Sequence, residues 1–479
     1  MAPTEGTGAK VENGTRSLVV GLGRSGIAAA KLLHKLGGEV TGLDSAPANR
    51  LDKNFLDWAG RHHVHLECGS RRDRLPPEIE LVVISPGVPL NLPLLTDARA
   101  RGVKVIGELA LAAALVSIPT VAVTGTNGKS TVTELIGEMF RRAGRRVFVG
   151  GNLGSPLSEY LLDPFGAEVL VLEVSSFQLD TAPDFRPEVG VLLNISPDHL
   201  DRYDDYEHYA ASKFSLFGAQ NSDDAAILNG DDPEITGRLA SADLPGRRFF
   251  FGQKWDETGR GAKIEGPEIM VRGIDAGKNE RYRLGNSPLV REPNPHNAAA
   301  AIIAARLLGC PEQAIAEALA GFKPLGHRLE KIAEIDGVHY LDDSKATNIG
   351  AVAAALAGMT RPVVLIAGGR DKGGDYRLMR EMVGKKVKAM VLIGEAREKM
   401  AEAFQEVTRV KSAADLAEAV NLARSLAEKG DAVLLSPACA SFDMFRSYGH
   451  RGEVFQEAVL ALQDKENSGH PGGTDDTIS

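Results

Sequence analysis

The sequence predicts an α/β protein with three domains. Runs of Val, Ile and Leu alternate with helical stretches along almost the whole chain, a pattern typical of parallel sheets covered by helices on both faces. The length of 479 residues fits roughly three domains of about 150 residues each. Two glycine-rich turns each follow an expected strand and precede an expected helix, and such turns bind phosphate groups. We therefore expect three sheets of similar style, two of them with a phosphate-binding turn.

The composition disfavours several classes of protein. The net charge is −9 and Lys and Arg are dispersed, which argues against a nucleic-acid groove. The chain has no run of about eighteen apolar residues, so we expect no membrane span. Its polar N-terminus lacks the apolar segment of a secretory signal. Cys68, Cys310 and Cys439 are far apart and odd in number, which predicts neither a disulfide framework nor a zinc site but thiols in a reducing cytoplasm.

The first block contains a glycine turn between a strand and a helix. Its expected elements are strands at 17–23, 38–44, 79–87 and 102–108 and a helix at 24–37. Gly21, Gly23 and Gly26 form the pattern G-x-G-x-x-G, and Asp44 ends the next strand, where an acid that binds ribose hydroxyls should lie. The turn fits an NAD-type dinucleotide, another nucleotide diphosphate, or a requirement of packing alone. If it were the only phosphate loop, we would expect an NAD-dependent dehydrogenase.

The second block opens with a second phosphate loop in residues 121–136, "VAVTGTNGKSTVTELI". The general P-loop motif requires Gly where this chain has Val123, but the remaining pattern is intact. Backbone N–H groups of Thr126 to Lys129 can cradle phosphate oxygens, and Lys129 can reach the β- and γ-phosphates. The Ser130 hydroxyl can bind Mg²⁺. The alternative is a glycine-rich turn with a solvated lysine, but the coincidence of strand, loop, Lys and helix favours phosphate binding.

Two further side chains follow strands of this block. Its other strands are expected at 167–173, 188–194 and 224–230. Glu173 ends the first of these strands, and His199 lies just beyond the second. A lone Glu or His is ordinarily a helix cap or a surface residue. Candidates at the carboxyl ends of successive strands, however, favour a metal site, because ligands gather at that edge of an open α/β sheet.

The remaining chain continues the α/β pattern. Residues 245–290 are Gly-rich and predict short strands and loops, and 294–309 predicts a helix with Asn294 near its N-cap and Pro295 at its first position. Gly321, Pro324 and Gly326 predict a hinge. The third block has four expected strands, at 337–343, 361–369, 389–395 and 431–437.

Long motifs, in order along nearly the whole chain, resemble the Mur ligase family, which builds the peptide stem of bacterial peptidoglycan. "TGTNGKST" resembles the ATP loop of the family, including the departure at Val123. "LEVSSFQL" resembles its magnesium-glutamate segment, "PDHLDRY" its histidine segment and "YAASKFSLF" the segment whose lysine is carbamylated. "GHRLE" and "YLDDSKATN" resemble its nucleotide contacts.

Within the family, three segments resemble the branch that adds D-glutamate. These segments are "GGNLG" (150–154), "EVSSFQL" and "SPACASFDMFRSYGHRGEVF" (436–455), and the D-N-P-R motif of the meso-diaminopimelate-adding branch is absent from the sequence. The resemblance implies an ATP-dependent ligase that joins D-glutamate to UDP-N-acetylmuramoyl-L-alanine through an acyl phosphate, in peptidoglycan precursor synthesis. The related alternative is folylpolyglutamate synthase, against which the first glycine turn argues.

The resemblance also implies a division into domains. We expect a Rossmann-like domain that binds the UDP-substrate at 14–112, a central P-loop-type ATPase domain at 113–324, and a Rossmann-like domain that binds the amino acid at 325–464. Polar tails at 1–13 and 465–479 are expected to be disordered. The expected partners are ATP, UDP-N-acetylmuramoyl-L-alanine and D-glutamate, without nucleic acid, and the enzyme is expected to be a cytoplasmic monomer.

Residue roles follow from the same resemblance. The UDP-substrate site would comprise Gly23, Ser25, Asp44, Ser85 and Asn152. The ATP site would comprise Gly125, Thr126, Asn127, Gly128, Lys129, Ser130, Thr131, Asn297, Arg328 and Asp343. The D-glutamate site would comprise Thr347, Lys372, Ser441 and Tyr448. Two positions depart from the family pattern: Ser45 and Ala46 follow Asp44 where some relatives have Arg, and Tyr448 stands where Phe is expected.

The resemblance further implies two Mg²⁺ ions. The first would be held by Ser130, Glu173 and phosphate oxygens. The second would be held by His199 and by a carbamate that CO₂ forms on Lys213. The catalytic residues would be Lys129, Glu173, His199, Lys213 and Arg328, of which Lys129 and Arg328 would spread negative charge during phosphoryl transfer.

Overall fold

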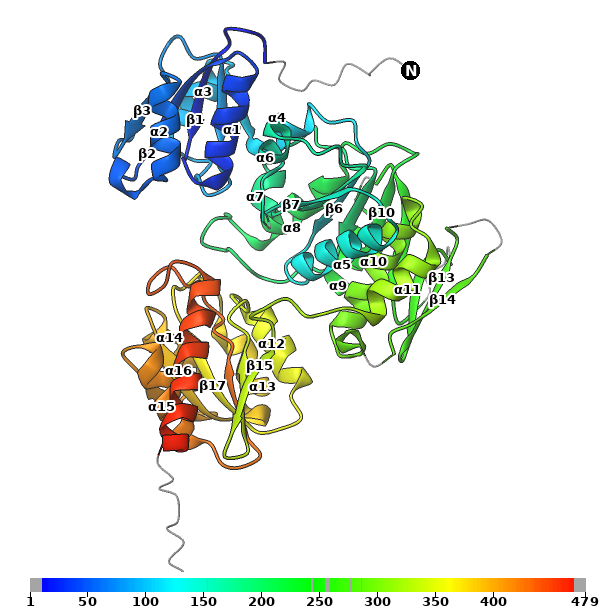
Figure 1. Cartoon of the computed structure of the whole chain (residues 1–479), viewed down its shortest axis with the longest axis vertical. Helices are drawn as coiled ribbons and strands as arrows, with labels where there is room; N and C mark the ends of the chain where they lie inside the picture. Colours follow the sequence, from blue (N-terminus) through cyan, green and yellow to red (C-terminus); the bar gives the residue numbers. More distant parts are fainter. Residues whose placement is uncertain are drawn as a thin grey trace, which may run out of the picture. The chain divides into compact units, whose positions relative to one another are not determined.

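The structure is a computed structural model, and it describes residues 11–152, 154–242, 244–254, 259–274, 278–285 and 287–468. Within these residues the strands form three sheets of five, nine and six strands, which follow one another along the chain from blue to red in Figure 1. The chain divides into two compact units: Met1–Ile195 with Glu207–Phe322, and Ser196–Tyr206 with Lys323–Ser479. The first unit holds the first two sheets. The predicted α/β class with three sheets is confirmed.

The first sheet has the strand order β3-β2-β1-β4-β5, and its neighbouring strands are all parallel. Its elements are β1 (Arg16–Val20), α1 (Arg24–Lys35), β2 (Glu39–Asp44), η1 (Ala48–Arg50), α2 (Lys53–Arg61), β3 (His65–Cys68), β4 (Leu81–Ile84), α3 (Pro93–Ala100), β5 (Lys104–Gly107) and α4 (Glu108–Ala113). The strand order reverses between β1 and β4, and ligands of open α/β sheets bind at such a point. The strand expected at 17–23 ends at Val20 because Gly21 has a φ of +85° and begins the turn into α1.

The central sheet has the order β14-β13-β12-β11-β10-β9-β6-β8-β7. Its strands are β6 (Thr120–Thr124), β7 (Val147–Gly151), β8 (Val169–Glu173), β9 (Val189–Leu192), β10 (Ala225–Asn229), β11 (Arg247–Gly252), β12 (Gly261–Glu265), β13 (Glu268–Arg272) and β14 (Glu280–Arg283). The region 245–290, expected as short strands and loops, supplies β11 to β14, and the last two strands run antiparallel to their neighbours. Because β6 lies between β8 and β9, the segments that follow these three parallel strands emerge at one edge of the sheet.

Helices cover this sheet. They are α5 (Lys129–Arg142), α6 (Leu157–Leu162), α7 (Ser176–Leu179), α8 (Tyr206–Phe214), η2 (Ser215–Phe217), α9 (Pro233–Arg238), η3 (Pro288–Val290), α10 (Asn294–Leu307) and α11 (Glu312–Ala320). Every residue from Ala298 to Ala305 in α10 is fully buried, and α10 shares one hydrophobic core with α5. The predicted N-terminus of α10 is wrong by one position: Pro293 is the N-cap, so Asn294 is the first helical residue and Pro295 the second. A proline in the first turn still removes no intrahelical hydrogen bond.

The third sheet has the order β15-β16-β20-β17-β18-β19. Its elements are β15 (Glu330–Ile335), β16 (Val338–Asp342), α12 (Ile349–Gly358), β17 (Val363–Gly368), η4 (Tyr376–Met379), α13 (Arg380–Lys386), β18 (Val387–Ile393), α14 (Arg397–Phe404), β19 (Arg409–Ser412), α15 (Leu416–Leu426), β20 (Ala432–Leu435) and α16 (Tyr448–Ser468). Alternate residues of β17 face two hydrophobic clusters: Val363 and Leu365 belong to one, Val364 and Ile366 to the other. Burial on both faces explains why this strand is a continuous apolar run.

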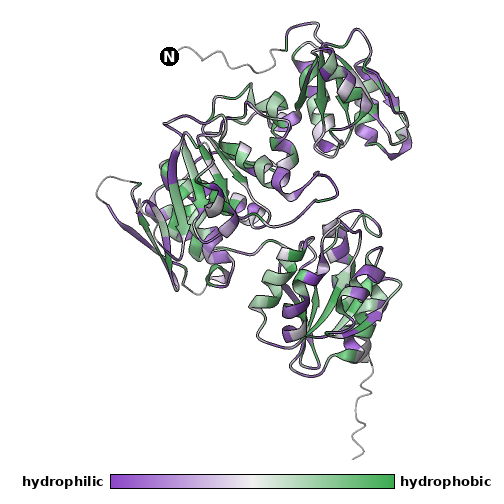
Figure 2. Ribbon diagram, turned by 180° about the vertical axis from the view of Figure 1, so that it is seen from behind, coloured by the Kyte–Doolittle hydropathy of each residue, from purple (hydrophilic) through white to green (hydrophobic). Residues whose placement is uncertain are grey.

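The expected polar tails, 1–13 and 465–479, lie largely outside the described residues. Figure 2 shows hydrophobic residues concentrated in the strands and hydrophilic ones on the outer faces of the helices. Among the described helices, none combines the length and the apolar character needed to cross a membrane.

Candidate active site

The second phosphate loop connects β6 to α5 and requires glycine at two positions. Gly125 has a φ of +146° and Gly128 a φ of +88°, a region that side-chain-bearing residues rarely adopt. A Cβ atom at Gly125 would lie 3.0 Å from the Cβ of Leu193, and one at Gly128 would lie 2.5 Å from Asn297 Oδ1. The loop is therefore packed tightly between the end of β9 and the start of α10, which places the predicted adenine contact, Asn297, beside it.

Asn194, which the sequence analysis did not single out, fixes the conformation of this loop. Its backbone carbonyl accepts a hydrogen bond from Thr126 N–H (2.9 Å), and its Oδ1 accepts one from Asn127 N–H (2.8 Å). Its Nδ2 donates to the Asn127 carbonyl at 3.0 Å. Two N–H groups of the expected cradle, those of Thr126 and Asn127, thus donate to Asn194 in this structure. The first turn of α5 offers further N–H groups, because the first N–H groups of a helix have no intrahelical acceptor.

Two lysines lie against the same carbonyl of the loop. Lys129 Nζ donates to the carbonyls of Gly125 and Thr126, both at 2.9 Å, and Lys213 Nζ donates to the Gly125 carbonyl at 3.0 Å. Lys213 is only 2% exposed and lies over the ring of Tyr209, with Nζ 4.6 Å from the centroid. The alternative of a surface lysine is therefore wrong for Lys213. The Lys129 cation beside a loop at a helix N-terminus favours an anionic ligand.

The predicted magnesium ligands of the first unit lie at the edge of the sheet that carries the loop. Glu173 ends β8 and is buried, and Ser130 is buried in the first turn of α5. Asn152 Nδ2 donates to Glu173 Oε1 at 2.6 Å, and the Asn152 N–H donates to the Glu173 carbonyl at 2.8 Å. A hydroxyl and a buried carboxylate are the oxygen donors that Mg²⁺ prefers, so this set fits the ion.

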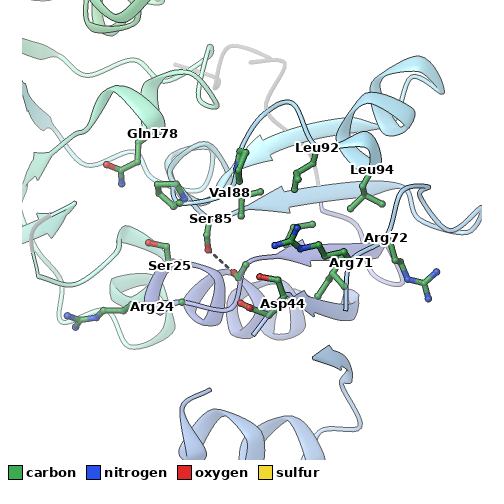
Figure 3. Close-up of a pocket in the computed structure, with 18 of the residues that line it drawn as sticks. Arg24, Ser25, Asp44, Arg71, Arg72, Ser85, Val88, Leu92, Leu94 and Gln178 are labelled. Carbon is green, nitrogen blue, oxygen red and sulfur yellow. Dashed lines mark hydrogen bonds between the residues drawn. The ribbon is translucent and has the colours of Figure 1, made fainter. Parts of the chain in front are cut away.

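All five predicted UDP-substrate residues line one cavity of about 870 Å³, shown in Figure 3. It lies at the carboxyl ends of β1, β2 and β4, where the strand order reverses. The residues are Gly23, Ser25, Asp44, Ser85 and Asn152. An apolar side of the same cavity is formed by Val88, Leu92 and Leu94.

The three glycines of the first turn have different roles. A Cβ atom at Gly26 would lie 1.8 Å from the Gly21 carbonyl oxygen, so Gly26 is required for close packing of α1 on the turn. A Cβ atom at Gly23 would meet nothing within 4 Å, which leaves space for a ligand beside the backbone. Asp44 accepts hydrogen bonds from the N–H groups of Leu22 (2.6 Å) and Ala46 (2.7 Å), so its carboxylate also holds the turn. Packing therefore explains the glycine at position 26 of the G-x-G-x-x-G pattern but not the one at position 23.

Three of the predicted residues line a small cleft in the second unit: His199, Thr347 and Lys372. They surround Asp198, which the sequence analysis did not single out. Lys372 Nζ donates to Asp198 Oδ1 at 3.2 Å, and His199 Nε2 lies 3.7 Å from Asp198 Oδ2. Burial raises the pKa of Asp198, but the charges of Lys372 and His199 outweigh it and hold the pKa below its usual value. Lys372 is thus a paired cation and not a solvated one.

Asp343 and Arg328, predicted to contact the nucleotide, interact with each other in the second unit. Asp343 accepts hydrogen bonds from Ser436 Oγ (2.7 Å) and from the Leu329 N–H (3.3 Å). Burial raises the pKa of Asp343 to about 7, although the Ser436 hydrogen bond and the charge of Arg328 act in the opposite direction.

Ser441 and Tyr448, the other two predicted D-glutamate residues, do not line the cleft of Lys372. Lys345 Nζ lies 3.8 Å from the centroid of the Tyr448 ring, so a tyrosine at this position supplies a face for a cation.

Arg451 was also missed, although it lies within the quoted 436–455 motif. It is fully buried and donates to Ser344 Oγ (3.0 Å) and to the Cys439 carbonyl (3.1 Å), and burial lowers its pKa to about 10. The loop that precedes α16 is therefore tied to the segment after β16.

Three family models match successive parts of the chain. They are the Mur ligase MurD-like N-terminal domain at 15–107, the Mur ligase middle domain at 123–305, and the Mur ligase glutamate ligase domain at 327–439. The chain is 44% identical over 469 residues to the UDP-N-acetylmuramoylalanine–D-glutamate ligase of Desulfosudis oleivorans, a match that covers 98% of this chain and 100% of the relative. The ligase of the same name from Syntrophotalea carbinolica is 43% identical, over 94% of this chain and 98% of its own.

Solved structures share the fold at lower identity. A pseudomurein peptide ligase type C from Methanothermus fervidus matches with a TM-score of 0.60 and 20% identity, over 94% of this chain and 100% of its own. Folylpolyglutamate synthase from Mycobacterium tuberculosis matches with a TM-score of 0.55 and 16% identity, over 71% of this chain and 91% of its own. At these identities the matches establish the fold alone.

Proposed function

The chain belongs to the Mur ligase family, and on that premise we propose that it joins D-glutamate to UDP-N-acetylmuramoyl-L-alanine in peptidoglycan precursor synthesis. The reaction converts ATP to ADP and phosphate. The observation that carries the proposal is the 44% identity, over essentially the full length of both chains, to a ligase with this activity in its name. A folylpolyglutamate synthase is disfavoured by the MurD-like N-terminal match, and an NAD-dependent dehydrogenase by the second phosphate loop.

The chemistry explains why two phosphate loops are needed. A carboxylate is a poor electrophile at neutral pH, so the L-alanine carboxylate must first be activated. Transfer of the γ-phosphoryl group of ATP gives an acyl phosphate and ADP. The neutral amine of D-glutamate then attacks the acyl carbon, and the tetrahedral intermediate loses a proton from nitrogen and expels phosphate to give the amide. The first loop would hold the UDP-substrate, and the second would hold the ATP.

The residues of the second loop have the chemistry that phosphoryl transfer requires. The first turn of α5 would bind phosphate oxygens, and Lys129 would exchange its two loop carbonyls for the β- and γ-phosphates. Ser130 and Glu173 would hold a Mg²⁺ ion, which neutralises phosphate charge when bound. Arg328 would add positive charge, Asn297 would contact adenine, and Asp343 would contact ribose. Thr347, Lys372, Ser441 and Tyr448 would hold D-glutamate.

Lys213 is buried, as a surface lysine would not be. We propose that its neutral amine reacts with CO₂ to give a carbamate and a proton. The burial of Lys213 supports this step, because a buried ammonium is costly and a neutral amine is the nucleophile that the reaction needs. The carbamate would offer two oxygens to a second Mg²⁺, for which His199 is the other proposed ligand. We further propose that the enzyme acts as a monomer in the cytoplasm, where ATP is available.

The test is phosphate release by the full-length chain with ATP and Mg²⁺. We expect release only when both D-glutamate and UDP-N-acetylmuramoyl-L-alanine are present, with a product heavier by one glutamate residue in mass spectrometry. Release with a folate and L-glutamate, or release that does not depend on the UDP-substrate, would contradict the proposal.

A further inference from the structure

Arg71 extends into the cavity of the first domain. It follows β3 and lines the cavity together with Ser85 and Asp44. Figure 3 shows its guanidinium turned into the cavity toward Ser85, whereas the guanidinium of Arg72 turns outward. Ser85 Oγ donates to the Gly21 carbonyl at 2.7 Å. The Arg71 side chain therefore points toward the glycine turn at the N-terminus of α1.

The other arginines near the cavity are already neutralised by carboxylates. Arg24 pairs with Glu159 at 3.0 Å, and Arg72 pairs with Glu67. Within the described part of the chain, no carboxylate oxygen lies within 4.0 Å of a guanidinium nitrogen of Arg71. Arg71 is thus a cation that faces the cavity without an acidic partner from the described residues.

A cation would offset the acidic part of the cavity lining. Two of the lining residues, Asp44 and Asp73, are acidic. A nucleoside diphosphate would bring two more negative charges to the same space. The N-terminus of α1 contributes only partial positive charge and backbone N–H groups.

We propose that Arg71 is a recognition residue that binds the diphosphate of the UDP-linked substrate. The inference rests on the proposed function, because it takes the ligand of this cavity to be a UDP-sugar. The planar guanidinium can donate two parallel hydrogen bonds to phosphate oxygens, on the side of the diphosphate opposite the first turn of α1. Arg71 would in this way add, from the loop after β3, a full positive charge to the partial charge of the α1 N-terminus.

The test is titration calorimetry of UDP and of uridine against the full-length chain and three variants. We expect Arg71→Ala to weaken UDP binding by about 10- to 100-fold, the loss of a charge-assisted hydrogen bond, and to leave uridine binding unchanged. Arg71→Lys should restore part of the affinity for UDP, because lysine keeps the positive charge but lacks the two parallel N–H donors of the guanidinium. Arg72→Ala is the matched control and should bind UDP as the unmodified chain does. Thermal unfolding of each variant checks that the fold is intact.

Two results would overturn the assignment. One is equal UDP affinity of the folded Arg71→Ala and Arg72→Ala variants, and the other is an equal loss of affinity for UDP and uridine. The titration contains neither ATP nor D-glutamate, so its outcome is independent of ligase activity. A chain that binds UDP through Arg71 but forms no D-glutamate product would contradict the proposed function and leave this inference standing. In an active enzyme, Arg71→Ala should raise KM for the UDP-substrate and leave kcat within about twofold, the small change expected when only uniform binding is lost.

Discussion

Replacing Asn194 with Ala tests whether the side chain that braces the phosphate loop controls ATP binding. The substitution removes two hydrogen bonds, from Asn127 N–H to Oδ1 (2.8 Å) and from Nδ2 to the Asn127 carbonyl (3.0 Å). At about 1 kcal/mol each, their loss costs the ordered loop about 2 kcal/mol. Because the ligand would have to restore that order on binding, we expect KM for ATP to rise about 30-fold. Phosphate release measured against ATP concentration gives the value.

The control for this substitution is Asn221→Ala. Asn221 also caps a turn, accepting a hydrogen bond from Asp223 N–H at 2.9 Å, but it lies in a solvent-exposed turn away from the loop. It should leave KM for ATP unchanged, and UDP binding should be unaffected in both variants. A folded Asn194→Ala variant with the unmodified KM for ATP would refute the reasoning, as would an equal rise in Asn221→Ala.

Three further outcomes are expected. Lys129→Ala should lower kcat by about 10²- to 10³-fold, because it removes a cation from the transferred phosphate, while calorimetry shows unchanged UDP binding; near-normal turnover would contradict this role. Lys213→Ala should be nearly inactive and partly rescued by formate or acetate in the phosphate-release assay, and undiminished turnover would exclude a carbamate there. In the folded protein the pKa of Asp343 is raised to about 7. Its protonated form therefore contributes its full share to the free energy of unfolding below about pH 4, and this contribution is lost as the pH rises to about 7. The free energy of urea unfolding should therefore fall more steeply between pH 4 and 7 in the unmodified chain than in Asp343→Asn, and identical profiles would argue against the buried acid.

The alternation of apolar runs and helical stretches was enough to predict the three sheets. Most of the strands are buried on both faces and therefore consist mainly of Val, Ile and Leu. β15 and β19 were missed for the opposite reason. Both are edge strands with exposed residues, "EKIAEI" and "RVKS", so burial does not impose a readable pattern on them. Strand ends were overestimated where glycine turns follow, because a positive φ at Gly21 is a backbone property that apolar periodicity does not report.

The candidate site was predictable where one short motif contains all the residues that act together, as in the phosphate loop from Gly125 to Thr131. Asn194, Asp198, Lys345 and Arg451 were missed because their partners are distant in sequence or are backbone atoms. The bond between Asn194 and the phosphate loop spans 67 residues, and that between Arg451 and Ser344 spans 107. One signal was available for Asn194, since it is the polar last residue of the apolar run 188–194, whose strand lies next to β6. The orientation of Arg71 had no signal in sequence at all.

Asn152 has a consequence for how the binding of one substrate affects the affinity for the other. The Asn152 amide lines the cavity proposed for the UDP-substrate and also donates to Glu173, the proposed metal ligand beside the second phosphate loop. We propose that a sugar diphosphate that binds this amide would weaken its hydrogen bond to the carboxylate, and that binding of the two substrates is coupled in this way. Thermodynamic linkage makes the effect reciprocal: if the UDP-substrate tightens Mg²⁺-ATP by some factor, Mg²⁺-ATP tightens the UDP-substrate by the same factor. We expect this synergy to disappear in Asn152→Ala, measured as equal ATP affinities with and without the first substrate.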